Sequence, residues 1–460
     1  MKFVYYPIEI YSREIEGALL VAADLTDNGY TVLIGGKQEL FSRIPNLKPG
    51  LFLLKSIVPG EVRFLEKIKQ FGHKIIVHDI EGLVPSVGKS GTLLRYSEET
   101  IALTDKILVW GERQANDLCS AFGAARQKVY VCRHPASELW YVRGKRVTPN
   151  TNSNRINSIL VATSFPFCNH INQDQSAFKA VKNAFGDSGS PELLDQIQLD
   201  ADLQTFIFPR FQEFVISICR TFSYAAVIIR PHPTENREAW EKICQKYTNA
   251  RLDENISIDP SLATVDALVH FNSTTSIQAH VSGVESFMFY PSDIPDELVG
   301  RISPLTAACS RFVESASDLC LVDDYQPSIS EWLAPARGNE FRAQASAEIM
   351  NVDVVEHAPL TKFELILLIY TNAHYFLHSI KLRLIWLRGC IDFYTNIFQG
   401  RYRSKKNFFK YGDSKIGGFT KNNIVDLIDE LESIGIKGLK NRNLTFGRRM
   451  MLVRKYANFN

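Results

Sequence analysis

Short apolar runs alternate with longer amphipathic stretches through most of the chain. The apolar runs have the length of buried strands and lie at residues 2–6, 31–34, 51–54, 74–78, 106–110 and 129–132. The stretches between them carry apolar residues at helical spacing, as at residues 12–27, 61–71 and 114–122. Because strands that alternate with helices form parallel, doubly wound sheets, this pattern predicts an α/β fold.

A polar segment divides this pattern into two. Residues 145–158 read KRVTPNTNSNRINS, and a new apolar strand begins at Ile159. An amphipathic helix at residues 206–222 and a strand at residues 285–290 continue the alternation. We therefore expect two Rossmann-like domains that face each other across a cleft, at residues 1–145 and 158–335. A mostly helical extension at residues 361–460 is expected after them.

The extension differs from the body in charge. It holds 18 Lys and Arg against 7 Asp and Glu, although the net charge of the whole chain is +2. Its segment KLRLIWLRG mixes cations with apolar residues, which predicts contact with an anionic membrane surface rather than with nucleic acid. The alternative is a helical hairpin that packs on the body. No apolar run reaches the roughly 18–20 residues of a membrane span.

The cysteines and the N-terminus indicate the compartment. The 8 cysteines include no CxxC pair and mostly lie in apolar runs, as reduced core thiols do. The first residues, MKFVYYPIEI, reach Glu9 before any long apolar region, which is not typical of a signal peptide. We therefore expect a cytoplasmic protein.

Two strand ends carry the candidate chemistry of the second domain. Residues 225–233 supply Arg230, His232 and Pro233, and the proline keeps His232 extended. Residues 266–279 supply Asn272 and four hydroxyls at a helix start, which are Ser273, Thr274, Thr275 and Ser276. Helix N-termini, hydroxyls, arginine and histidine all favour an anion, so two such ends, neighbouring in one sheet, predict a nucleotide-phosphate site. Asn272 would then contact a sugar hydroxyl or a base edge. The alternatives are a turn histidine and ordinary helix N-caps.

The first domain offers two groups of charged residues. Asp79 and Glu81, in the run HDIEG at a strand end, suit a general base or a nucleophile. A carboxylate at a strand end can equally cap a helix or pair with an arginine. Glu9, Arg13 and Glu14 follow the first strand, either for binding the acceptor or for structure.

Several common signatures do not occur in the sequence. It contains no GxGxxG after a strand, no GxxxxGK[ST] and no HExxH, and its DxD, Asp200-Ala201-Asp202, does not follow an apolar strand. We therefore expect no metal and no cofactor, and a reaction with a monophosphate leaving group remains open.

An ordered set of segments resembles a known family. The segments are YYPIEIYSREIEGALLVAADLTDNGYTVLIGGK, HDIEGLV, ILVWGERQ, ILVATSFPFCNH, RPHPTEN and HFNSTTSIQA. They resemble the bacterial surface carbohydrate biosynthesis protein family over about residues 1–325. That family is GT-B glycosyltransferase-like, and the same motifs are similar to those of sialyltransferases and β-Kdo transferases, which use CMP-activated acidic keto sugars.

The resemblance implies a glycosyltransferase with a CMP-sugar donor and a glycan or glycolipid acceptor, peripheral to the inner membrane. It implies that Asp79 or Glu81 is the base or nucleophile and that His232 assists the departure of CMP. Thr163 and the hydroxyls from Ser273 to Ser276 would hold the nucleotide.

The sequence departs from that family in several places. Ile80 separates the two acidic residues, Gln278 stands where glutamate is frequent, and Thr163-Ser164 stands where asparagine and threonine are usual. The run VCRHPASEL differs at Arg133, Ala136 and Glu138. A UDP-type transferase or epimerase and a non-catalytic binding protein of the same pathway are therefore alternatives.

Overall fold

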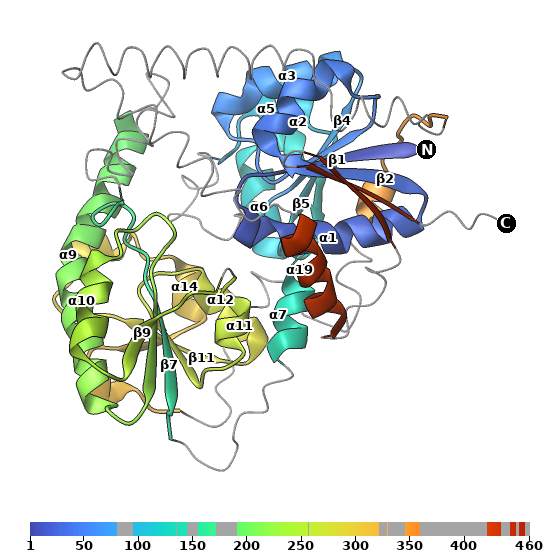
Figure 1. Cartoon of the computed structure of the whole chain (residues 1–460). Coiled ribbons are helices and arrows are strands. Elements are labelled where there is room, and N and C mark those ends of the chain that lie inside the picture. Colours follow the sequence, from blue (N-terminus) through green and yellow to red (C-terminus); the bar gives the residue numbers. More distant parts are fainter. Residues whose placement is uncertain are drawn as a thin grey trace, which may run out of the picture.

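The computed structural model describes most of the two predicted domains and part of the extension. The described residues are 1–80, 95–134, 136–144, 155–171, 191–255, 257–321, 329, 346–358, 421–433, 442–447 and 450–455. They form two Rossmann-like domains side by side (Figure 1). This confirms the predicted α/β, GT-B-like architecture.

The first domain is built on one mixed sheet in the order β13-β14-β2-β1-β3-β4-β5-β6. Its parallel strands are β1 (Lys2–Ile8), β2 (Tyr30–Gly36), β3 (Leu51–Leu54), β4 (Lys74–His78), β5 (Lys106–Val109) and β6 (Val129–Val131). The helices between them are α1 (Tyr11–Asp27), α2 (Lys37–Arg43), α3 (Val62–Gln70), α5 (Glu98–Leu103) and α6 (Glu112–Ala121). The predicted apolar runs form the buried strands because helices cover both faces of the sheet.

The second domain is built on a parallel sheet in the order β12-β11-β10-β7-β8-β9. Its strands are β7 (Ser158–Ala162), β8 (Ala226–Arg230), β9 (Ala250–Leu252), β10 (Ala267–His270), β11 (Glu285–Phe289) and β12 (Arg311–Val313). The main helices are α9 (Pro191–Thr221), α10 (Glu238–Lys246), α11 (Asp259–Leu262), α12 (Thr275–Ser282) and α14 (Pro304–Ala308). The expectation that β8 and β10 are neighbours is wrong, because β7 pairs with both and lies between them.

The C-terminal extension continues the first domain where the structure describes it. Helix α19 (Lys421–Ser433) buries Ile424, Ile428 and Leu431 in the core beside α1. A hairpin of β13 (Arg442–Gly447) and β14 (Met450–Lys455), which the sequence analysis did not predict, adds two antiparallel strands next to β2. The segment proposed for the membrane surface lies outside the described residues. No helix within them is long and apolar enough to cross a membrane.

A tight helix contact joins the two domains. Helix α7 (Ser137–Gly144) follows the first sheet and packs on α12 of the second domain. A Cβ on Gly144 would lie 2.1 Å from the carbonyl oxygen of Ser282, so only glycine permits this approach. The Ser282 hydroxyl donates to the Trp140 carbonyl over 3.1 Å.

A buried arginine reinforces this contact. Arg143 on α7 donates to both carboxylate oxygens of Glu16 on α1, at 2.9 and 3.1 Å, and to Asp259 on α11 at 2.9 Å. It also donates to Glu430 on α19 over 2.8 Å. Arg143 is 5% exposed, so its charge depends on these carboxylates for compensation. Both domains and the extension therefore meet at one guanidinium, a group we call the Arg143 joint.

Replacing Arg143 with methionine should destabilise the protein strongly. The substitution keeps an apolar stem but leaves the carboxylates of Glu16 and Asp259 without their buried cation, which costs about 3–5 kcal/mol. Arg210→Met is a matched control, since Arg210 pairs with Asp293 at the surface and such pairs contribute about 0–1 kcal/mol. Denaturant unfolding measures both, and equal effects of the two variants would contradict the role of the joint.

The joint should also make stability depend on pH. Burial and then the Glu16 carboxylate raise the pKa of Asp259 from 3.8 to about 7, although Arg143 opposes them. The folded protein therefore holds this proton to higher pH than the unfolded chain does. Asp259 thus contributes stability below about pH 4 that is lost as the pH rises to about 7. Asp259→Asn cannot ionise, so its stability should fall less than that of the wild type between these values; parallel curves would refute the assignment.

Candidate functional site

Sheet topology places one crevice in each domain. In the first sheet, β1 lies between β2 and β3, so the chain leaves β1 to one side and later returns to the other. In the second sheet, β7 lies between β8 and β10 in the same way. Open α/β sheets bind ligands outside the carboxyl ends of the strands at such switch points. The residues that follow β1, β3, β7 and β10 are therefore the candidates for binding.

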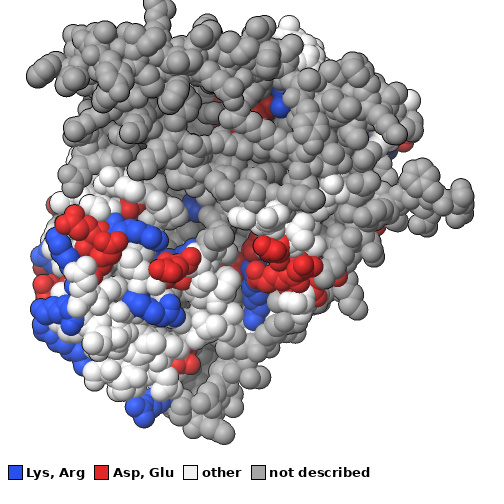
Figure 2. Space-filling model, viewed as in Figure 1, with Lys and Arg blue, Asp and Glu red and all other residues white. Residues whose placement is uncertain are grey.

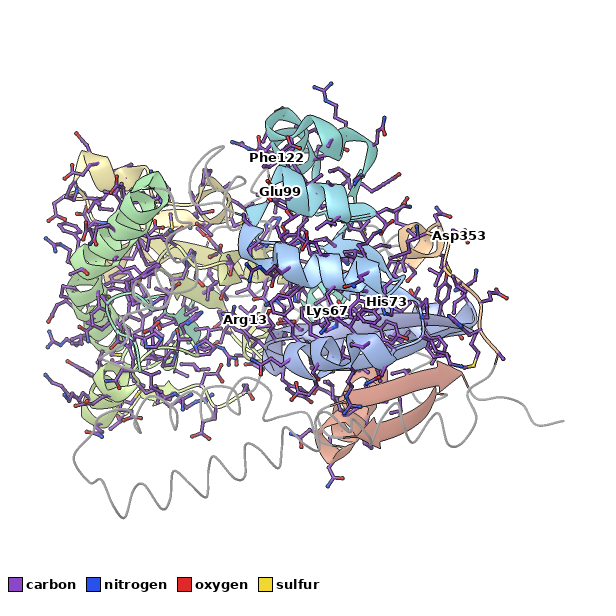
Figure 3. All side chains as sticks on the ribbon, turned by 90° about the horizontal axis from the view of Figure 1, so that it is seen from above. Arg13, Lys67, His73, Glu99, Phe122 and Asp353 are labelled. Carbon is purple, nitrogen blue, oxygen red and sulfur yellow. The ribbon has the colours of Figure 1, made fainter. Side chains whose placement is uncertain are left out.

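One contact connects the two crevices. Arg13, in the first turn of α1, lies with its Nη2 atom 2.9 Å from Nε2 of His232, which follows β8. Figure 3 shows Arg13 at the end of the first domain that faces the second. Because a guanidinium can only donate, Nε2 accepts this hydrogen bond. The proton of a neutral ring is then on Nδ1, which lies 2.9 Å from the Thr234 hydroxyl. The Thr234 N–H, 3.3 Å from the same atom, favours the opposite tautomer, so the shorter Arg13 contact sets this assignment.

The imidazole of His232 is neutral in this arrangement. Burial lowers its pKa to about 3, and the nearby Arg13 and His170 lower it further in the same direction. A neutral imidazole with Nε2 unprotonated accepts hydrogen bonds from the cleft. It becomes a donor there only after it gains a proton.

Glu235 fixes the turn that carries His232. This carboxylate is 1% exposed, and its Oε1 accepts from the Thr163 hydroxyl and from the Phe165 N–H, each at 2.8 Å. Its Oε2 accepts from the indole N–H of Trp240 at 3.1 Å. The His232 N–H lies 3.2 Å from Thr163 Oγ1. Glu235 therefore ties the ends of β7 and β8 together, a role that the sequence analysis missed.

The hydroxyl turn after β10 is partly bonded to itself. Ser276 is fully buried and donates to the Ser273 carbonyl over 2.9 Å, and Ser273 Oγ accepts from the Thr275 N–H over 3.3 Å. Thr274 is exposed and Thr275 is partly exposed. The four predicted ligand hydroxyls therefore divide into two that shape the turn and two, Thr274 and Thr275, that can reach a ligand.

Asn272 and His270 give this turn its shape. Asn272 has a φ of 45°, the left-handed region that asparagine tolerates better than most residues. Its Oδ1 accepts from the Ser303 N–H at 2.9 Å and from the Thr306 hydroxyl at 2.8 Å. Nδ1 of His270 accepts from the Ser273 N–H over 3.1 Å. The side chain of Asn272, which was predicted to contact a sugar hydroxyl or a base edge, is thus hydrogen-bonded to α14 and to the residue that precedes it.

Arg230 is held by a carboxylate of its own domain. Its Nη1 donates to Asp253 at 2.6 Å and to the Asn255 carbonyl at 2.9 Å. Asp253 is 2% exposed and also accepts from the Ser261 hydroxyl. Arg230, which was expected to supply charge to a phosphate, is thus already compensated by Asp253. Pro233, next to His232, is exposed.

The acidic motif of the first domain is only partly described. Asp79 is 0% exposed, and its carboxylate accepts from Arg95, from Tyr96 and, at 3.2 Å, from Gln114. Its carbonyl accepts from the Trp110 indole. The pairing of a strand-end carboxylate with an arginine, one of the expected alternatives, is what the structure shows for Asp79. Glu81 lies outside the described residues.

The charged group after β1 forms a network with two lysines. Glu9 accepts from Lys37 at 2.6 Å and lies 2.9 Å from Lys55, residues that directly follow β2 and β3. Burial would raise the pKa of Glu9, but Lys55 and Lys37 outweigh it and lower the pKa to about 2. Glu14 is 4% exposed and accepts from the Glu9 and Ile10 N–H groups at the start of α1. Glu14 is thus structural, and Glu9 is too acidic for a base near neutral pH.

Among the described residues, no group of three or more His, Cys, Asp and Glu is arranged to hold a metal ion.

Removing the Glu235 carboxylate should loosen the His232 turn. In Glu235→Ala the buried donors on Thr163, Phe165 and Trp240 lose their acceptor. Each unsatisfied buried group costs about 1–3 kcal/mol, so the three together should cost at least about 3 kcal/mol. Glu238→Ala is the matched control, because Glu238 lies on the following helix and pairs with Lys242 in solvent. Unfolding of both variants by denaturant measures the difference; a Glu235→Ala protein as stable as the control would rule out this network.

The chain was compared with known proteins. No profile of a protein family matches it, and no curated protein matches it. It is similar to the structure of UDP-GlcNAc 2-epimerase from Methanocaldococcus jannaschii with UDP-GlcNAc and UDP, with a TM-score of 0.46, 10% identity and coverage of 76% of this chain and 99% of that one. The corresponding values for the wall teichoic acid polymerase TagF are 0.45, 10%, 76% and 88%. For S. aureus MnaA with UDP they are 0.41, 11%, 76% and 89%. These likenesses concern the fold and assign no activity to this chain.

Proposed function

We propose that this protein is a glycosyltransferase that moves an acidic keto sugar, Kdo-like or a nonulosonic acid, from a CMP-activated donor to a bacterial surface glycan. The observation that carries the proposal is the contact of Arg13 with His232, which brings the switch-point crevices of two Rossmann-like domains to one place. The ordered motifs that resemble the surface carbohydrate biosynthesis family support the choice of donor.

The donor nucleotide is assigned to the second domain. Thr274 and Thr275 present hydroxyls at the N-terminus of α12, where partial positive charge favours a phosphate. Thr163 and His232 lie at the ends of the adjacent strands β7 and β8. The leaving group of a CMP-sugar is a phosphate monoester, whose charge these donors can stabilise as it departs.

The reaction transfers the sugar from phosphate to an acceptor hydroxyl. The acceptor oxygen forms the new bond to the anomeric carbon, the bond from that carbon to the phosphate oxygen breaks, and its electron pair leaves with CMP. The acceptor proton goes to a general base. We assign this base to Glu81, because the carboxylate of Asp79 is buried and already accepts three hydrogen bonds.

The acceptor is assigned to the crevice of the first domain. Glu9, Lys37 and Lys55 are partly exposed there and present charged donors and acceptors to sugar hydroxyls. The basic extension is proposed to hold the protein at an anionic membrane surface, where a glycolipid acceptor would lie. On the face that Figure 2 shows, acidic and basic side chains are interspersed over the described residues of the second domain, unlike the single-sign basic face typical of nucleic-acid binding.

Nucleotide binding and turnover test the proposal together. The wild type should bind CMP more tightly than UMP or UDP in titration calorimetry, and should release CMP from CMP-Kdo or CMP-N-acetylneuraminate in the presence of an acceptor. Glu81→Gln should lower turnover by about 10²–10⁴-fold, the usual contribution of a general base. Its affinity for CMP should stay unchanged, since the residue acts on the acceptor.

Other outcomes would point elsewhere. A preference for UDP over CMP would favour a UDP-type transferase or an epimerase. Binding of CMP without turnover of any CMP-sugar would favour a non-catalytic protein of the same pathway. Asp79→Asn serves as a comparison with Glu81→Gln. Asp79 is buried and bonded within the first domain, so we expect its substitution to lower the stability of that domain as well as turnover.

A further inference from the structure

Arg13 is unusual among the arginines of the interdomain region. Arg143 and Arg230 are each compensated by carboxylates. Arg13 is exposed, and its one side-chain hydrogen bond among the described residues is with the neutral ring of His232. The carboxylates nearest to it in sequence are already bonded: Glu14 to backbone N–H groups, Glu16 to Arg143, and Glu9 to two lysines. Among the described residues, this positive charge therefore faces the site without a negative partner.

The surroundings of His232 add to this excess of positive charge. The charged or titratable groups that act on the imidazole are Arg13 from α1 and His170, whose segment pairs with Glu235 as an isolated bridge. Glu235 is directed at the backbone of the turn, 3.3 Å from the His232 N–H, and Thr234 occupies Nδ1. Nε2 is thus the ring atom left for the cleft, and in this structure it accepts from Arg13.

We propose that Arg13 is a phosphate-binding residue of the donor site, which with His232 holds one phosphate between the two domains. The inference rests on the proposed function, and it assigns to the first domain a part of the donor site. A phosphate offers several anionic acceptor oxygens. When it binds, the Arg13 guanidinium gives up its hydrogen bond to the neutral imidazole and forms a stronger, charge-assisted one to the phosphate.

Phosphate binding then brings a proton to His232. With Arg13 turned to the phosphate, Nε2 faces an anionic oxygen and must donate to it. One proton passes from solvent to Nε2, and no bond to phosphorus is made. Without ligand, burial and the neighbouring Arg13 and His170 lower the pKa of His232 to about 3 and keep the ring neutral. An anion bound between these groups raises the pKa of His232 again, because it stabilises the imidazolium. The imidazolium formed in this way is poised to stabilise the departing phosphate.

Calorimetry with the full chain tests the inference, with CMP and inorganic phosphate as probes at pH 7. Repeating each titration in buffers of different ionisation enthalpy counts the protons taken up. The wild type should take up more protons on binding than His232→Asn, which has no imidazole. Any change in the protonation of the ligand itself is common to both proteins, so the difference between them reports His232. Arg13→Gln should weaken CMP about 10–100-fold, the range expected for a lost hydrogen bond to a charged group. Arg13→Lys should recover part of this affinity, because it restores the charge but not the fork of donors.

The matched control is Arg63→Gln, which removes another exposed arginine of the first domain, on α3, and should bind CMP as the wild type does. Thermal unfolding checks that the Arg13 variants remain folded. If Arg13→Gln binds CMP as tightly as the wild type, or if His232→Asn takes up as many protons, the inference is overturned while the proposed function stands. A third outcome is that phosphate binding is weakened by Arg13→Gln and is accompanied by proton uptake, but CMP binds no more tightly than phosphate. The inference then stands and the choice of donor fails. Binding of neither probe to the wild type overturns both.

Discussion

The interface between the two domains depends on Arg143. A guanidinium that is 5% exposed is tolerable only where carboxylates compensate it, and here Glu16, Asp259 and Glu430 come from the first domain, the second domain and the extension. The close approach of α7 to α12 at Gly144 allows these groups to meet. Both sheets are thereby held with their candidate crevices within reach of one another, and α19 is attached to the same point.

The contact of Arg13 with His232 follows from that arrangement. Arg13 and Glu16 belong to the same helix, one turn apart, so the helix that anchors the joint also presents Arg13 to the second domain. Glu14 lies between them and fixes the start of α1 by accepting two backbone N–H groups. A change at the Arg143 joint would therefore displace Arg13 from His232. Stability and the proposed ligand binding are then coupled through α1.

The sequence predicted most strands of both sheets because they are short, mainly apolar runs. It missed β9 and β12, three-residue strands that include the exposed Arg251 and Phe312, and the C-terminal hairpin, whose partner strand β2 lies more than 400 residues earlier. It correctly placed His232 and the hydroxyl turn at strand ends. It could not show that Arg13 meets His232, since that contact depends on how the domains are joined. The sequence signal for Glu235 was a glutamate three residues after His232, in the run HPTE, close enough to bond to the same turn.

The environments of the carboxylates distinguish their roles. Asp79 has no exposed surface and holds Arg95 and Tyr96 in place, Glu14 caps a helix, and Glu235 fixes a turn. Lys55 and Lys37 keep Glu9 ionised to low pH, so it accepts a proton poorly. A general base must reach the acceptor and have a pKa closer to the working pH, and none of these four carboxylates meets both conditions. Of the acidic residues that the strand ends offered, this leaves Glu81, two residues after the buried Asp79, for the proposed role of base.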